Sequence, residues 1–139
     1  MIRAAAFVAL LVLAGSGPAW GQAAGRQVQA RYSPSYGRCM ASSAAKSTVG
    51  MIDCIAAETR IQDRHLNQTY SKALMDLTID QRQRLQAAQR AWIAFRDADC
   101  GARVDPQQWG SISRINGATC VLNRTIQRTI ELENFPPAT

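Results

Sequence analysis

The stretch 88–100, AQRAWIAFRDADC, brings amides, arginines and carboxylates into one segment with helical periodicity. Two neighbouring carboxylates are the groups that glycosidases use for acid, base or nucleophilic catalysis. Asp97 and Asp99 are neighbours of this kind in the sequence. However, positions i and i+2 project from different sides of a helix, so we do not expect these two carboxylates to act as a catalytic pair.

Other arrangements typical of enzymes are missing from the sequence. The single histidine, His65, stands between Arg64 and Leu66, and we expect it at the surface. The chain has no glycine-rich phosphate-binding loop and no HExxH zinc motif. We therefore predict a non-catalytic protein that needs no cofactor or metal ion.

The first 21 residues have the layout of a secretory signal peptide. A basic start at Arg3 precedes an apolar run, 4–14, and small residues occupy Ala19 and Gly21. The run is too short to span a bilayer as a mature helix. We predict cleavage after Gly21, no stable membrane span after cleavage, and a periplasmic or secreted protein. An uncleaved anchor or a buried helix is the alternative.

Four cysteines in a small exported chain predict two disulfides. They are Cys39, Cys54, Cys100 and Cys120, with gaps of 14, 45 and 19 residues between them. The sequence has no Cys-x-x-Cys pair, so a zinc site fits poorly. Of the three possible pairings we favour Cys39–Cys54 and Cys100–Cys120, because each pair brackets a loop-like segment.

Apolar residues at helical spacing predict three long helices. The first covers about 52–77. The second begins at Thr78, where Gln81 completes a capping box, and continues to Cys100. The third covers 113–133, and two prolines end it. A tight turn near residue 78 makes the first two helices an antiparallel hairpin.

The remaining segments complete a prediction of one helical domain. Residues 22–38 are polar and contain Gly, Ser and Pro, which is typical of a disordered lead-in. Residues 101–110 contain a proline and two glycines and predict a loop. No alternating strand pattern is present, so the predicted fold class is all-α. It is a long antiparallel helical hairpin plus a third helix, stapled by two disulfides, over residues 39–134.

Each predicted helix has an apolar stripe that should face the core. The stripe residues are Ile55, Thr59, Leu66, Tyr70, Ala73 and Leu77 on the first helix, Leu85, Ala88, Trp92 and Phe95 on the second, and Ile115, Leu122, Ile126 and Ile130 on the third.

Polar residues also share helix faces in the predicted hairpin. Facing residue numbers should sum to roughly 157, because both helices rise equally per residue. The faces in question carry Asp63, Asn67 and Tyr70 on the first helix and Gln89, Trp92 and Arg96 on the second. We interpret them as a structural polar seam, with Arg96 paired to Asp63 and Asn67 paired to Gln89. A partly buried charge needs such a partner.

The chain is basic, with 16 Lys and Arg against 10 Asp and Glu, a formal net charge of +6. Removal of Arg3 with the signal peptide leaves 15 against 10, or +5. The charges are dispersed and no nucleic-acid-binding motif is present, so we exclude nucleic acid as a partner. An envelope binding or structural protein, whose basic surface meets anionic lipid or cell-wall polymer, remains an alternative function.

Three ordered motifs, DRHLNQTY (63–70), AQRAWIAFRDADC (88–100) and CVLNRTIQRTIEL (120–132), resemble the LprI-type lysozyme-inhibitor-like domain family. With Cys39 and Cys54, the similarity covers about residues 39–132. The resemblance implies a small exported helical domain of the bacterial envelope that acts as a protein-binding inhibitor, with lysozyme or another envelope protein as its partner. The matching residues are Asp63, Leu66, Asn67, Tyr70, Ala88, Gln89, Trp92, Arg96, Asp97, Cys100, Cys120, Thr125, Arg128 and Leu132.

The candidate binding loop lies beside Cys100 and contains Asp97, Asp99, Asp105 and Trp109. A loop held by a disulfide is preorganised for recognition. Animal-type lysozyme is basic, so a basic inhibitor would have to offer it a local acidic patch. We expect binding through loop 101–119 or loop 40–51. In the alternative, Trp109 packs under its loop and has no role in recognition.

Overall fold

The computed structural model describes residues 19–135, which contain helices and no strands. The predicted all-α class is therefore confirmed. The elements are α1 (Ala19–Gln29), α2 (Pro34–Ala41), the 3-10 helix η1 (Ser43–Lys46), α3 (Thr48–Met75), α4 (Ile79–Gly101), α5 (Pro106–Trp109) and α6 (Ile112–Glu133).

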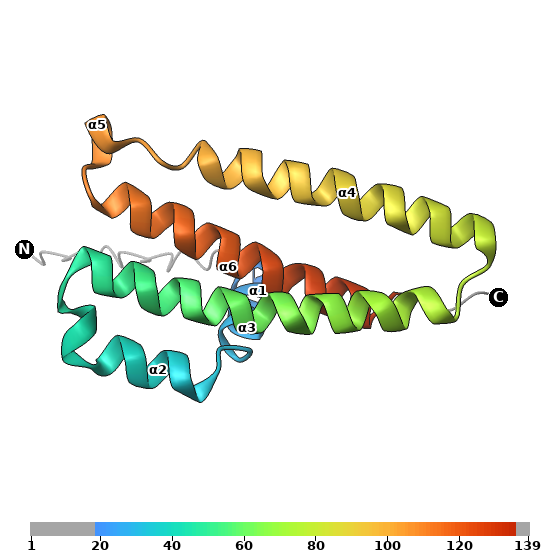
Figure 1. Ribbon diagram of the computed structural model, residues 1–139, viewed down its shortest axis with the longest axis horizontal. Helices are drawn as coiled ribbons and strands as arrows, with labels where there is room; N and C mark the ends of the chain where they lie inside the picture. The colour runs from blue at the N-terminus through green and yellow to red at the C-terminus, as the bar shows by residue number, and fades with distance from the viewer. Residues whose placement is uncertain (1–18, 136–139) are drawn as a thin grey trace, which may run out of the picture.

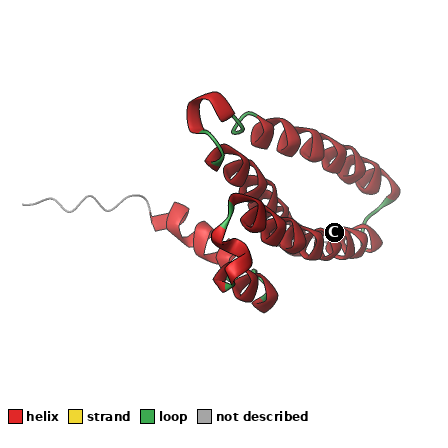
Figure 2. Ribbon diagram, turned by 60° about the vertical axis from the view of Figure 1, so that its left-hand side comes forward, coloured by secondary structure: helices red, strands yellow, loops and turns green. Residues whose placement is uncertain are grey.

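Three long helices form the body of the molecule, and α6 lies between α3 and α4 (Figure 1). Helices α3 and α4 meet at a short turn and separate away from it, while α6 stays alongside α3 (Figure 2). Helix α2 packs on α3, and α1 lies against α6. Among the described helices, none is both long and apolar enough to cross a membrane.

Local side-chain caps fix where the helices begin. At α4, the Thr78 hydroxyl accepts from the Gln81 backbone N–H at 3.3 Å, and the Gln81 side chain accepts from the Thr78 N–H at 2.9 Å. This is the predicted capping box. At α3, the Ser47 hydroxyl accepts from the Gly50 N–H. Such caps satisfy backbone donors that would otherwise have no partner in the first turn.

Two apolar clusters form the core. Leu66, Leu77, Leu85 and Leu132 pack together at the α3–α4 turn. Ile55, Leu122 and Ile126 pack between α3 and α6. All seven were on the predicted stripes except Leu132.

Two predicted core positions on α4 are wrong. Ala88 is exposed, and Phe95 is 54% exposed. Helix α4 buries the predicted Leu85, together with Gln89 and Cys100, which were not on the predicted stripe. The face of α4 that meets α6 is therefore rotated away from the predicted stripe.

Both predicted disulfides are confirmed. Cys39–Cys54 joins α2 to α3, and Cys100–Cys120 joins α4 to α6. The bonded cysteines are 15 and 20 residues apart. Loops of this size contribute about 3 kcal/mol each in the chain-entropy account of disulfide stability.

The prediction of a disordered lead-in over 22–38 is wrong, because most of this segment is helical and it is anchored to the body. The Arg31 guanidinium donates two hydrogen bonds to Glu133, at 2.8 and 2.6 Å, and lowers the pKa of that carboxyl. The Tyr32 hydroxyl donates to Asn123 at 2.5 Å. The polar groups of this segment are hydrogen-bond partners of α3 and α6 and do not form a solvated tail. Residues 1–18 of the predicted signal peptide lie outside the described residues.

Candidate binding surface beside the second disulfide

The Cys100–Cys120 disulfide fixes both ends of the segment that carries the candidate loop. Within it, the Asp105 carboxylate accepts from the backbone N–H groups of Gln107 and Gln108, at 3.0 and 3.1 Å, and so caps α5. Gly110 ends α5 with a φ of 57°, a conformation that favours glycine. The loop is thus organised by its own sequence as well as by the disulfide.

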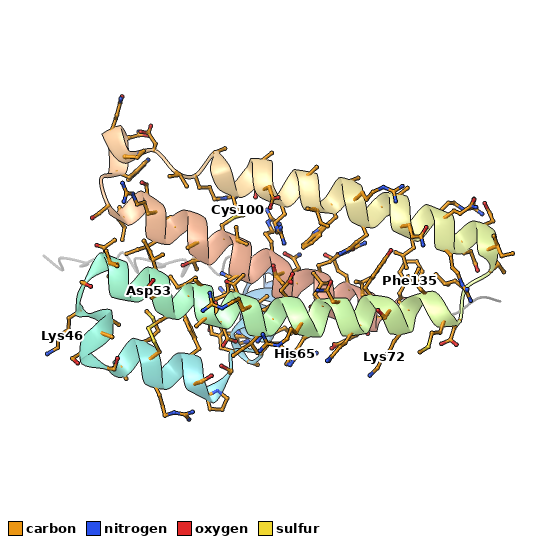
Figure 3. The ribbon with its side chains drawn as sticks, viewed as in Figure 1. Lys46, Asp53, His65, Lys72, Cys100 and Phe135 are labelled. Carbon is orange, nitrogen blue, oxygen red and sulfur yellow. A yellow bond between two sulfur atoms is a disulfide. The ribbon has the colours of Figure 1, made fainter. Side chains whose placement is uncertain are left out.

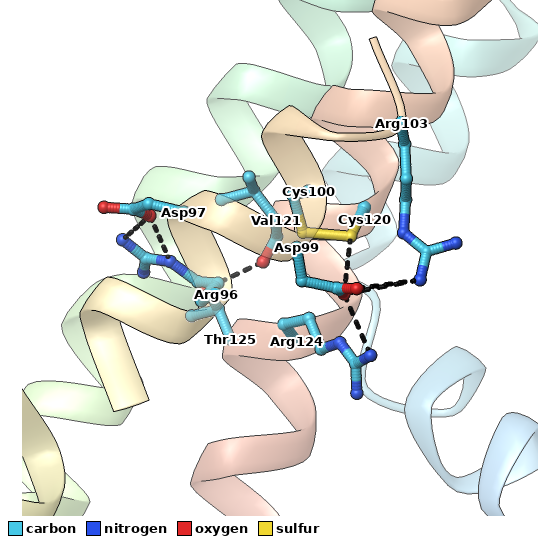
Figure 4. Close-up of a disulfide and its surroundings, with 9 residues drawn as sticks. All are labelled: Arg96, Asp97, Asp99, Cys100, Arg103, Cys120, Val121, Arg124 and Thr125. Atoms are coloured by element: carbon cyan, nitrogen blue, oxygen red, sulfur yellow. Dashed lines mark hydrogen bonds and ion pairs between the residues drawn. A yellow bond between two sulfur atoms is a disulfide. The ribbon is translucent and has the colours of Figure 1, made fainter. Parts of the chain in front are cut away.

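Asp99 is held by two arginines (Figure 4). Arg124 donates to its carboxylate at 3.0 Å, and Arg103 donates at 3.3 Å. The hydrogen bond from Arg124, supported by that from Arg103, holds the pKa of Asp99 below its usual value although partial burial opposes this. Asp99 therefore stays ionised and its charge is more than matched locally.

Asp97 is also paired, with the neighbouring Arg96 at 2.8 Å. Asp97 and Asp99 thus pair with arginines, and Asp105 accepts hydrogen bonds as a helix cap. Each of the three carboxylates therefore has a partner within the chain. The candidate loop therefore presents no open acidic patch.

Trp109 does not pack under its loop, since 56% of it is exposed. Val104 and Ile112 are also exposed, at 41% and 48%. A Cβ on Gly117 would lie 2.5 Å from the Val104 side chain, so this glycine allows the loop to approach α6 closely. The loop presents three apolar side chains on a supported backbone.

The polar-seam residues are paired differently from the prediction. Asn67 donates to Asp63, on its own helix, at 3.3 Å, and both are exposed. Gln89 is buried and accepts from the Arg128 guanidinium at 3.0 Å. The predicted pairs assumed that α3 and α4 lie together along their lengths, whereas α6 lies between them.

The aromatic members of the predicted seam have structural contacts. Trp92 contacts the guanidinium groups of Arg96 and Arg128, which lie 5.1 and 5.9 Å from the centroid of its ring. These arginine side chains are only 16% and 15% exposed. Tyr70 packs against the leucine cluster at the turn. Cation–π contacts of this kind strengthen when they are sheltered from water.

Comparison with protein-family models matches residues 39–132 to the family described as "Lysozyme inhibitor LprI". The chain belongs to the LprI family. Comparison with curated proteins and with solved structures gives no significant match. The LprI match includes both disulfides and the long helices, apart from the final residue of α6, whereas α1 precedes it. The disulfides fit an oxidising compartment.

Several residues of the LprI resemblance have clear structural roles. Leu66 and Leu132 belong to the core, and Gln89, Trp92 and Arg128 join α4 to α6. The resemblance included Arg128, but the predicted seam did not. Its spacing of eight residues from Cys120 places it about two turns further along α6 and could have indicated a shared partner helix.

Sequence reasoning also missed Arg103 and Arg124 as partners of Asp99. The first follows Asp99 by four residues, which is a recognisable helical pairing distance. The second lies four residues after Cys120, so the disulfide brings it to Asp99. The ligand atoms of Asp99, Cys100 and Cys120 lie within 4.8 Å of one another, but the two sulfurs are bonded together and offer no thiolate to a metal.

Proposed function

We propose that this protein is an exported, non-catalytic, lysozyme-inhibitor-like domain that binds its partner through loop 101–119. The observation that carries the proposal is the LprI match across the disulfide-bonded helical body. The exposed Trp109 supports the choice of surface. Tryptophan is among the residues that most often dominate the binding energy of protein interfaces.

The loop has the preorganisation that a tight contact needs. The Cys100–Cys120 bond, the Asp105 cap and the contact of Val104 at Gly117 hold its backbone before binding. Ordering a flexible loop on binding would otherwise reduce affinity. Loop 40–51 is the second candidate surface, since it contains η1 and exposes 69% of Val49.

Charge determines how this contact would form. The chain is basic, and the carboxylates near Trp109 are held by arginines or by a helix cap. A basic lysozyme would therefore experience no long-range attraction to the loop. We expect inhibition through apolar contact at short range, with little dependence on salt.

The side chains also support a non-catalytic role. All four cysteines are oxidised in disulfides. His65 lies on the exposed side of α3, away from the candidate loop (Figure 3). Neither residue type offers an activated nucleophile or a positioned base in this arrangement.

The test is lysozyme activity on cell-wall substrate with the oxidised protein in excess, at low and physiological salt and with several lysozyme types. We expect dose-dependent inhibition that is lost on reduction. Trp109→Ala should weaken inhibition about tenfold, as expected for an interface anchor. Met75→Ala is the control, because Met75 is 66% exposed at the opposite end of the body. No inhibition of any lysozyme type would refute the proposed function.

A further inference from the structure

A groove of about 1000 Å³ lies between α1 and α6 and reaches Trp109. Its α1 wall includes Gly25 and Val28, and Tyr32 follows on the same side. The α1 wall lies before the residues that match the LprI family. Its volume is at the upper end of that of small-ligand sites, so it can accept an elongated ligand.

Carboxamide side chains dominate the polar lining of the groove. They are Gln27, Gln29, Asn116, Asn123, Gln127 and Asn134. Three of the four asparagines in the sequence belong to this set. Asn116, Asn123 and Gln127 of α6 and Asn134 just after it follow one another at spacings of 7, 4 and 7, so they form one stripe along the helix.

This stripe is not used to build the core. Helix α6 contacts α3 through Leu122 and Ile126 and contacts α4 through Arg128. Within the described part of the chain, the exposed Asn116 and Gln127 make no side-chain hydrogen bond. Asn116 and Gln127 therefore each keep a free donor and a free acceptor for a ligand, whereas the Asn123 oxygen accepts from Tyr32 and the Asn134 amide donates to the Ile130 carbonyl.

The end of the groove near Trp109 adds a flat surface and positive charge. The indole is largely exposed. Arg103 and Arg124 line the same groove and share one carboxylate, that of Asp99. Two positive charges against one negative charge leave an excess of one positive charge at this end.

We propose that the groove binds an amino-sugar oligosaccharide. Hydroxyl and acetamido groups repeat along such a chain and match the free donor and acceptor pairs of Asn116 and Gln127. The C–H face of a sugar ring can stack on the Trp109 indole. The excess positive charge suits a sugar that carries a carboxylate. The proposal concerns the polymer that lysozyme cleaves and does not require contact with lysozyme.

Two other ligand classes fit less well. An extended peptide would need apolar pockets for alternate side chains, as in strand-like peptide recognition. The α6 stripe presents amides at those positions instead. A polyanion held by charge alone would need several phosphate-binding cations along the groove. The groove offers an excess of only one at its Trp109 end.

Isothermal titration calorimetry with the oxidised protein tests this site. The probes are a hexamer of N-acetylglucosamine and a peptide-free muramic-acid-containing strand of equal length. We expect saturable binding with one site per chain, stronger for the carboxylate-bearing strand. Trp109→Ala should weaken binding about tenfold and Gln127→Ala about fivefold, from one lost stacking or hydrogen-bonding contact.

Matched controls separate this site from the inhibitor surface. Gln86→Ala removes an exposed glutamine of α4 outside the groove and should leave glycan binding unchanged. Ile112→Ser alters the exposed loop but not the groove lining, and should weaken lysozyme inhibition alone. Conversely, Gln127→Ala should weaken glycan binding alone.

Each contrary result has a distinct meaning. Absence of binding to both glycans overturns the groove proposal, whether or not lysozyme is inhibited. Binding that survives Trp109→Ala and Gln127→Ala but disappears in salt also overturns it, because the dispersed basic surface would then be responsible. Binding of an unrelated extended peptide in preference to the glycans would assign the groove to peptide recognition and would likewise overturn it.

Discussion

Each of the two disulfides has a carboxylate beside it, and the two carboxylates differ in burial and in the kind of donor that binds them. Beside Cys39–Cys54, Glu58 is 1% exposed and accepts hydrogen bonds from neutral donors, the Ser33 backbone and hydroxyl and the Gln62 side chain. Beside Cys100–Cys120, the Asp99 side chain is 25% exposed and is bound by two arginines.

This difference separates a buried structural anchor from a partly exposed ion pair. Glu58 fixes the start of α2 to α3 through the Ser33 main chain, and Gln62 also donates to the Arg31 carbonyl at 2.7 Å. Removing either partner would leave buried polar groups without hydrogen bonds. The arginines at Asp99 can be solvated when the pair separates, so this ion pair contributes little to the stability of the second region.

The largest effect is expected from a substitution that removes the buried carboxylate beside Cys39–Cys54. Glu58→Ala should lower the free energy of unfolding by about 3 kcal/mol, because buried donors lose their acceptor. Asp99→Ala should lower it much less. Urea denaturation of the two oxidised variants measures the difference. Equal losses would show that the two carboxylates have the same structural importance.

A smaller effect tests how tightly each loop is fitted. In Gly50→Ala, the new Cβ would lie 1.7 Å from the Ala44 carbonyl oxygen, so backbone must shift. We expect a loss of about 2 kcal/mol in urea denaturation. Gly37→Ala is the matched control, because nothing lies within 4 Å of its Cβ and helix propensity favours alanine by about 1 kcal/mol. Similar behaviour of the two variants would contradict a tight fit at η1.

The equivalent substitution in the second region should be milder. In Gly117→Ala, the Cβ meets the tip of the partly exposed Val104 side chain, which can move. Since alanine also favours the helix, we expect a change in unfolding free energy of about 0.5 kcal/mol or less. Displacement of the loop should nevertheless weaken lysozyme inhibition. A large loss of stability with intact inhibition would reverse the roles assigned to the two regions.

The smallest effect is a pH dependence at Asp99. Its lowered pKa in the folded protein stabilises the fold above the usual aspartate pKa of about 3.9, and this contribution is lost as the pH falls through the lowered value. Asp99→Asn should therefore be slightly less stable than the parent near pH 7, and the two should converge in acid. Urea denaturation from neutral to acidic pH measures this difference in stability, and Asp53→Asn, at an exposed position, is the control. If the stability difference between Asp99→Asn and the parent were the same at every pH, the ion pairs of Asp99 with its arginines could not be its cause.

Local signals were sufficient to predict the three long helices and the disulfide pairing. The capping box at Thr78 and the apolar periodicity place α4 correctly, because both act within a few residues. The Cys100–Cys120 pairing also follows from the loop between the two cysteines. LprI membership could be recognised from ordered motifs that lie mainly on the three long helices.

Long-range partners could not be predicted in the same way. The facing pairs expected for Asp63 and Asn67 depended on two helices meeting, and the position of α6 is not encoded in the spacing of either helix. Glu58 and Gln62 are buried by a segment whose composition resembles that of disordered chains. The groove likewise depends on α1 returning to α6, which no local pattern specifies.

The connectivity of the two disulfides has a consequence for how the chain matures. The cysteines pair in the order of the sequence, first with second and third with fourth. When a chain enters an oxidising compartment from its N-terminus, an oxidase meets Cys39 and Cys54 before Cys100 and Cys120 have arrived. Joining cysteines as they emerge gives the native bonds directly. We therefore expect oxidative folding of this protein to give the native pairs without an isomerase to exchange mispaired sulfurs.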